Sequence, residues 1–227
     1  FSFNYQAFKD LIGYGMGMTF AKIANYFATQ GDKLIVGRML SSASLGVYGR
    51  AYNIMVMPAT LIGTAMDKAL FPTMAKVQDD SRKLRKAYSA GIEAIGALSI
   101  PLSVFVYLTS KEIVMVLLGP NWLDVVTPLK ILSIGLLFRM SYKLSDSMAR
   151  ATAMIFNRLW RQIIYAFLII IGAWGGSFYF GLKGVAVGVV FALFINFFLM
   201  ASLSIKIISM SWKEFVRCHL KGIFSGI

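Results

Sequence analysis

The chain has 227 residues, of which 58% are hydrophobic, and its mean hydropathy is +0.69. Soluble domains use about 45–50% apolar residues, so this composition excludes an ordinary soluble domain and indicates a membrane protein. The net charge of +13 would suggest a nucleic-acid partner in a soluble protein. The single cysteine, Cys218, excludes an internal disulfide, and the single histidine, His219, excludes a histidine-rich metal site.

Six apolar segments are long enough to cross a bilayer, which takes about 20 residues of helix. In chain order they cover roughly 10–38, 45–72, 88–109, 125–148, 161–180 and 184–206. Polar or glycine-containing turns separate them, including 41–44, 119–122 and 181–184, and Pro58 and Pro101 are expected to kink the second and third segments. The pattern predicts an all-α polytopic membrane protein, with a six-transmembrane-helix lobe over residues 1–208. Residues 209–227 are expected to form a cytoplasmic amphipathic segment that leads into a further helix, so the chain is interpreted as part of a longer protein.

The basic residues are distributed unequally between the two sides of this six-span arrangement. One side receives Arg38, Arg50, Lys111 and Lys183. The other side receives Lys76, Arg82, Lys83, Arg85, Lys86, Arg150, Arg158, Arg161, Lys206, Lys213, Arg217 and Lys221. Loops rich in Lys and Arg face the cytoplasm, so both ends of the chain are predicted to be cytoplasmic. Topology accounts for much of the positive charge, and no nucleic-acid partner is expected.

Three of the expected spans carry polar residues at helical spacing. The rows are Lys22, Asn25, Thr29 and Asp32 in the first span, Arg50, Asn53, Met57, Thr60, Thr64 and Asp67 in the second, and Arg139, Lys143 and Asp146, followed by Arg150, in the fourth. A charge near the bilayer centre costs about 2.5–3.5 kcal/mol on insertion scales and usually has a function. Three polar faces therefore predict one water-filled cavity that faces away from lipid.

The basic residues in the spans suit an anionic cargo, because Arg and Lys both bind phosphate. The candidate substrate-binding residues are Arg139, Lys143, Lys33, Arg38, Arg50, Asn25 and Asn53. Asp146 and Asp32 are candidates for ion coupling or for counter-ions of the basic groups. Two alternatives stay open: Lys33, Arg38 and Arg50 also suit the outer interface, and Asp32 with Lys33 also suits an internal ion pair. No catalytic constellation, cofactor motif or metal-ligand spacing is found in the sequence.

Several short motifs carry a resemblance to a known family. They are Gly31-Asp32-Lys33-Leu34-Ile35-Val36-Gly37-Arg38, Leu45-Gly46-Val47-Tyr48, Phe71-Pro72 and Leu118-Gly119-Pro120-Asn121-Trp122. Their order and spacing resemble the polysaccharide flippases of the multidrug/oligosaccharidyl-lipid/polysaccharide exporter superfamily. The resemblance implies two six-helix lobes around a central cavity, of which this chain is the C-terminal one, so that an N-terminal lobe of the same protein is missing.

The resemblance also implies a function and a location. Such proteins move polyprenyl-diphosphate-linked oligosaccharide across the bacterial inner membrane by alternating access, for surface polysaccharides such as O-antigen and exopolysaccharide. Basic cavity residues hold the diphosphate, which matches Arg139 and Lys143 at mid-depth and Lys33, Arg38 and Arg50 nearer the outer mouth. The expected partners are this lipid-linked cargo, membrane lipids and a coupling cation, with no cofactor.

Three other functions are weighed against the flippase, and one of them, a non-transporting scaffold related to flippases, would tolerate neutralisation of the cavity charges. A drug or small-molecule exporter of the same superfamily would need a dominant carboxylate in its spans, which the fourth span does not offer. A membrane glycosyltransferase or ligase would need a long extramembrane loop, and no connection between the expected spans is long enough for a catalytic domain. The sequence therefore favours a transporter over an enzyme.

Overall fold

The structure, a computed structural model, describes residues 5–225, without the side chains of residues 5–11, 13, 14, 17, 18, 21 and 223–225. Its elements are α1 (Tyr5–Met39), α2 (Ser42–Lys76), α3 (Ser81–Leu108), α4 (Ser110–Leu117), the 3₁₀ helix η1 (Pro120–Val125), α5 (Val126–Ile134), α6 (Leu136–Ala151), α7 (Ile155–Ile207) and α8 (Trp212–Ser225). Among these residues there is no strand. Three helices, α2, α3 and α7, are long and apolar enough to cross a membrane. The chain is an all-α membrane protein, as its composition predicted.

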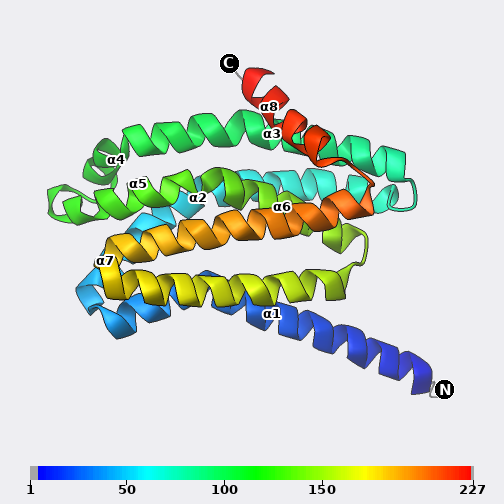
Figure 1. Ribbon diagram of the computed structural model, residues 1–227, viewed down its shortest axis with the longest axis horizontal. Coiled ribbons are helices and arrows are strands. Elements are labelled where there is room, and N and C mark those ends of the chain that lie inside the picture. Colours follow the sequence, from blue (N-terminus) through cyan, green and yellow to red (C-terminus); the bar gives the residue numbers. More distant parts are fainter. Residues whose placement is uncertain (1–4, 226–227) are drawn as a thin grey trace.

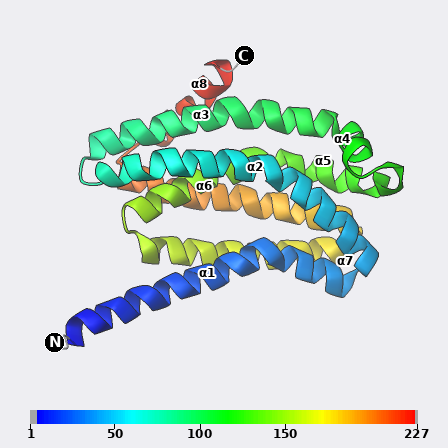
Figure 2. The same ribbon diagram turned by 180° about the vertical axis from the view of Figure 1, so that it is seen from behind.

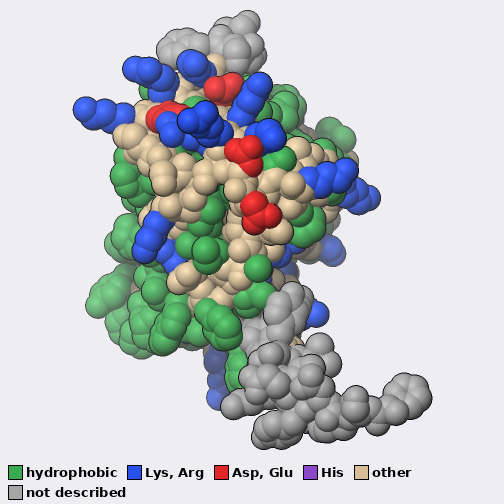
Figure 3. All heavy atoms as spheres, turned by 90° about the vertical axis from the view of Figure 1, so that its right-hand side faces the viewer, with side chains coloured by type: hydrophobic (Ala, Val, Ile, Leu, Met, Phe, Trp, Pro, Cys, Tyr) green, Lys and Arg blue, Asp and Glu red, His purple; other side chains and the backbone are tan. Residues whose placement is uncertain are grey.

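The long helices lie side by side along the long axis of the molecule (Figure 1). The first half of α7 lies against α1, and α3 lies on the opposite side of the bundle, with α2 and α6 between them (Figures 1 and 2). The turns between α2 and α3 and between α6 and α7 meet at one end, where Lys and Arg predominate over Asp and Glu (Figure 3). We call this end the basic end.

Two expected spans share the single helix α7, which folds back on itself at Gly181. This residue has φ 57° and ψ −138°, a backbone conformation that favours glycine. The two halves then pack closely through glycines, because a Cβ on Gly172 would lie 2.9 Å from the Gly188 carbonyl oxygen. A Cβ on Gly176 would likewise overlap the backbone of Gly184. Small residues that let helix backbones approach each other are common in membrane helix pairs.

The segment 125–148, expected to be one span, consists of α5 and α6 with a break at Gly135. The Gly135 N–H donates to the carbonyl of Leu132, three residues earlier, at 2.9 Å, which is the spacing of a 3₁₀ turn rather than of an α-helix. The α-helical hydrogen bonds resume after Gly135. A Cβ at Gly135 would lie 3.1 Å from Leu193 of α7. The break therefore lies at a point of close helix contact, and Arg139 comes just after it.

Helix α8 packs obliquely across α3 (Figure 1). Arg85 of α3 forms an ion pair with Glu214, and a Cβ on Gly96 would lie only 2.7 Å from the His219 carbonyl oxygen. Phe215 and His219 are buried, whereas Lys213, Arg217 and Lys221 are exposed. This helix is amphipathic, with its apolar face on the bundle. The expected continuation into a further helix concerns residues 226 and 227, which lie outside the described residues.

Candidate functional site

Arg139 lies in the interior of the bundle, enclosed by tyrosines. Its guanidinium carbon is 5.3 Å from the centre of the Tyr52 ring, and its charge interacts with Tyr142 and Tyr165 as well. These rings come from α2, α6 and α7, and Arg139 itself is only 5% exposed. Its Nε has no hydrogen-bond partner, and Arg139 forms no ion pair with a described carboxylate. The sequence predicted Arg139 in a water-filled cavity, and in this structure the side chain is instead covered by aromatic rings.

Asp32 and Lys33 of α1 border the same aromatic enclosure. Asp32 is 1% exposed, and its two oxygens accept hydrogen bonds from the Tyr48 hydroxyl at 2.6 Å and from the Lys33 backbone N–H at 2.9 Å. The Lys33 ammonium lies 4.9 Å from the centre of the Tyr52 ring, so Tyr52 contacts two cations from different helices. The expected pairing of Asp32 with the Lys33 side chain is absent from the ion pairs of the described residues.

Lys143, one turn after Arg139 on α6, has different surroundings. It lines a hollow of about 140 Å³ between α2, α3 and α6. The neighbouring wall of α2 is Gly63, where an added Cβ would lie 3.3 Å from Cδ and 3.5 Å from Nζ of Lys143. Lys143 is half-buried and forms no ion pair with a described residue. The side chain is therefore a cation with space around it and no carboxylate bound to it.

The acids around this hollow are held by arginines. Arg150 donates from Nη2 to both oxygens of Asp67 at 2.9 and 2.8 Å, and its Nε lies 3.2 Å from Asp146. Arg158, at the start of α7, also pairs with Asp146. The network links α2, α6 and α7 near the basic end. Asp146, expected as a partner for Arg139 or Lys143, is instead the counter-ion of two other arginines.

The remaining candidate residues lie farther from this hollow. Arg50 is exposed, with its guanidinium carbon 5.3 Å from the Trp122 ring centre, at the end of the bundle opposite the basic end. Arg38 and Asn53 are also exposed, on α1 and α2 respectively. The Asn25 side-chain oxygen accepts a hydrogen bond from Gln162 of α7 at 2.9 Å. Of the candidates, the structure brings Asp32, Lys33 and Arg139 together around Tyr52 and leaves Arg38, Arg50 and Asn53 on the surface.

The tyrosines around Arg139 were not among the site residues predicted from the sequence. Tyr48 and Tyr52 are one turn apart on α2, and Tyr142 follows Arg139 by three residues, so helical spacing already placed aromatic rings beside the charged positions. Tyrosine inside a bundle contributes a polar hydroxyl and a ring face that attracts cations. Among the described residues, no group of three His, Cys, Asp or Glu side chains could hold a metal ion. Of the cations described above, Lys143 is the one that combines a neighbouring hollow with the lack of an ion pair to any described residue.

A family model described as "Polysaccharide biosynthesis protein" matches residues 1–127. The lipopolysaccharide biosynthesis protein WzxC of Escherichia coli (strain K12) is 26% identical over 215 residues, which are 94% of this chain and 44% of that protein. The succinoglycan biosynthesis transport protein ExoT of Rhizobium meliloti (strain 1021) is 25% identical over 122 residues, 54% of this chain and 25% of that protein. The chain thus spans less than half the length of these relatives.

The fold is also similar to that of a solved structure, the lipid II flippase MurJ in an inward closed conformation. The TM-score is 0.79 at 16% identity, and the match covers all of this chain and 49% of that one. The likeness to the MurJ fold and the helices long enough to span a membrane agree with a multi-pass membrane protein, and the relatives named above are bacterial. The predicted resemblance to polysaccharide flippases is confirmed. Because the family model covers more than half of the chain, this protein belongs to the family of polysaccharide biosynthesis proteins.

Proposed function

We propose that this chain is one six-helix lobe of a flippase that moves polyprenyl-diphosphate-linked oligosaccharide across the bacterial cytoplasmic membrane. The observation that carries the proposal is Lys143, a cation that forms no ion pair with a described residue and lines a hollow inside a membrane-spanning bundle. A charge at this depth is costly unless it meets water or a ligand, and a lysine ammonium binds phosphate as a point charge. The function is that of a transporter, with no chemical change to the cargo.

The surface next to the hollow supports a path for a polar cargo. The hollow shares Thr64, Asp67 and Arg150 with a second depression, which Lys68, Phe71 and Pro72 also line. Along α2, the exposed polar side chains at helical spacing are Arg50, Asn53, Thr60, Thr64 and Lys68, and the apolar residues Met57 and Leu61 are exposed among them. A polar row on a membrane-spanning helix favours water or protein over lipid as its neighbour. The other wall of the path would come from a part of the longer relatives that this chain does not cover.

Charge distribution supports the orientation in the proposal. At the basic end, the helix ends next to the α2–α3 and α6–α7 turns are rich in Lys and Arg, so this end would face the cytoplasm (Figure 3). A diphosphate arriving from that side would meet Arg150 and Lys143 before it reached Arg139. For a coupling cation or proton we assign Asp32 rather than Asp146, because the hydrogen-bond donors to Asp32 are neutral, whereas two arginines hold Asp146.

The experiment is Lys143→Gln in the full-length protein, expressed in cells that lack the native gene. A hydrogen bond to a charged group contributes about 1.5–3 kcal/mol, so cargo binding should weaken by about 10–150-fold. We expect surface polysaccharide to disappear and lipid-linked oligosaccharide to accumulate, while the amount of protein in the membrane is unchanged. Lys183→Gln, which removes an exposed charge in the turn of α7, should export normally. Normal export by the Lys143→Gln protein would refute the proposal.

A further inference from the structure

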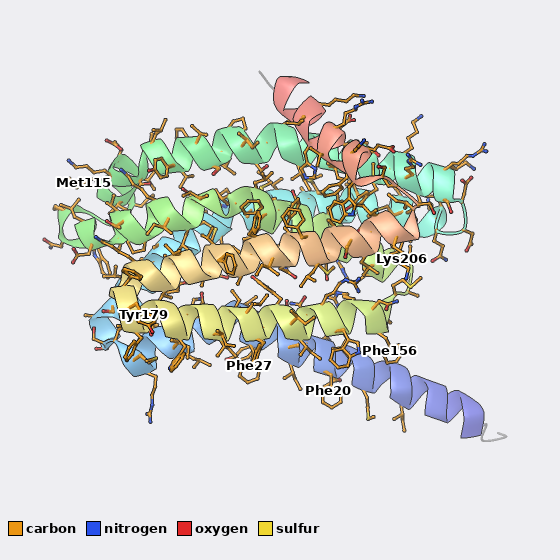
Figure 4. The ribbon with its side chains drawn as sticks, in the orientation of Figure 1. Phe20, Phe27, Met115, Phe156, Tyr179 and Lys206 are labelled. Carbon is orange, nitrogen blue, oxygen red and sulfur yellow. The ribbon has the colours of Figure 1, made fainter. Side chains whose placement is uncertain are left out.

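A second hollow lies at the basic end, away from the Lys143 site. It measures about 540 Å³ and is formed by the two ends of α7 together with the α2–α3 and α6–α7 turns. It shares no lining residue with the hollow around Lys143. Figure 4 shows Phe156 and Lys206, from the beginning and the end of α7, at this same end of the bundle. Its polar lining includes Gln78, Asp79, Asn157, Arg161 and Lys206.

Arg161 is held in this hollow by backbone carbonyls, and none of the described acids pairs with it. Its Nε donates to the Leu199 carbonyl and its Nη1 to the Asn157 carbonyl, both at 2.8 Å. The guanidinium of Arg161 forms no ion pair with a described residue. The side chain is half-buried, so its charge is only partly hydrated. An oriented guanidinium with free donors is suited to an oxyanion such as phosphate.

The other polar groups around the hollow complete a site for one anion. Lys206 adds a second positive charge from the last turn of α7, and Gln78 and Asn157 add side-chain amides. The first turn of α7 has no side-chain cap at Met154, so its backbone N–H groups are not occupied by a capping side chain. Asp79 is the one acid among the lining residues, and it leaves the hollow with a net positive charge.

The depth of the hollow matches the phosphate layer of a membrane. Arg161 lies six residues into α7, or about 9 Å from its start, which is near a membrane surface if α7 crosses the bilayer. Trp160, the preceding residue, is 68% exposed, and Phe156 one turn earlier is 69% exposed. Exposed aromatic residues next to basic ones are typical of the level where lipid headgroups meet the hydrocarbon. Lipid phosphates are therefore the anions that this hollow would meet at high concentration.

We propose that the hollow between the two ends of α7 binds the phosphate of a membrane lipid through Arg161 and Lys206. Two lipids offer this chemistry: an anionic phospholipid, and the polyprenyl diphosphate that anchors the cargo of the proposed flippase. Lipid binding in this hollow does not depend on transport activity, so a binding measurement is enough to test it. If the proposed flippase function were refuted, the proposal that this hollow binds an anionic phospholipid would still hold.

The test uses the purified full-length protein in detergent, titrated separately with phosphatidylglycerol, phosphatidylethanolamine and a polyprenyl diphosphate, with bound lipid counted by native mass spectrometry. The variants are Arg161→Gln, whose amide retains a donor for a backbone carbonyl, and Lys206→Gln, which changes an exposed side chain. Each charge near a membrane surface contributes about 1 kcal/mol, so each variant should weaken binding about fivefold. Asp79→Asn should strengthen binding by a similar factor. Lys86→Gln, an exposed lysine of α3 outside the hollow, is the matched control.

The outcomes separate the two lipid sources. Retention of phosphatidylglycerol that weakens in both variants supports a structural phospholipid, and the same pattern for polyprenyl diphosphate alone supports a cargo-docking site. The proposal is overturned if Arg161→Gln and Lys206→Gln bind both anionic lipids as well as Lys86→Gln does. Phosphatidylethanolamine, whose headgroup has no net charge, should bind more weakly than phosphatidylglycerol. Equally tight binding of the two lipids that neither substitution weakens would also overturn the proposal.

Discussion

Replacing Arg139 by methionine should make the protein more stable and, at the same time, inactive. Arg139 is 5% exposed, has no carboxylate within ion-pair distance among the described residues, and leaves its Nε without a partner. Its guanidinium lies over the Tyr52 ring, 5.3 Å from the ring centre. Methionine has a similar length and no charge, so it can fill the same space among the tyrosines.

The magnitude follows from two opposing contributions. Arg139 lies near the middle of the segment formed by α5 and α6. At the middle of a membrane-spanning segment, a charged side chain costs about 2.5–3.5 kcal/mol on insertion scales. A cation over an aromatic ring returns about 0.5–2 kcal/mol of that cost. The difference predicts that Arg139→Met raises the stability of the bundle by about 0.5–3 kcal/mol. Asp32 keeps both of its hydrogen bonds, to Tyr48 and to the Lys33 backbone, in the variant.

The assay compares two substitutions of the same kind on one helix. Arg150→Met removes a cation that holds Asp67 and Asp146, at a side-chain exposure of 37%, so it should lower stability by up to about 1 kcal/mol. Thermal unfolding of the full-length protein in detergent, followed by size-exclusion chromatography, should therefore show melting temperatures that move in opposite directions. Cells carrying Arg139→Met should lose surface polysaccharide despite normal protein levels. A melting temperature that falls with Arg139→Met would show that Arg139 is held for structure and would refute this reasoning.

Two further predictions concern the packing of α7 and α8. Gly172→Ala should destabilise the protein by about 1–3 kcal/mol, because its Cβ would lie 2.9 Å from the Gly188 carbonyl oxygen, whereas Gly175→Ala, with no atom within 4 Å of its Cβ, should melt as the unchanged protein does. Burial lowers the pKa of His219 from its ordinary value of 6.5. When α8 is packed on the bundle, His219 therefore binds fewer protons than when α8 has come away from it. The packing of α8 should be most stable above pH 6.5 and should weaken as the pH falls below that value. Hydrogen-exchange protection of α8, corrected for the intrinsic exchange rate, should fall between about pH 7 and pH 5. His219→Gln, which can retain the hydrogen bond to Ser141, should remove this pH dependence; unchanged protection of the original protein across the range would contradict the prediction.

The all-α membrane fold could be predicted because it depends on quantities that are local in the sequence. Apolar length fixes which segments can cross a bilayer, and turn residues show where they end. Gly181 illustrates this, because the chain reverses at the first residue of the expected 181–184 connection. The division of 125–148 into α5 and α6 was not predictable in the same way. Gly135 alone does not end a helix, and its break accompanies close packing against Leu193 from a distant part of the chain.

The environment of the two central cations could not be predicted from their own helix. Arg139 and Lys143 are one turn apart on α6, so periodicity gave them the same face and the same expected cavity. Their surroundings differ because α2 places the bulky ring of Tyr52 beside Arg139 and only the backbone of Gly63 beside Lys143. Residue size on the facing helix therefore decides which cation is covered and which has space for a ligand. A sequence pattern can identify candidate charges in a bundle, but their accessibility depends on pairing each with its neighbours on the other helices, and that pairing is set by tertiary structure.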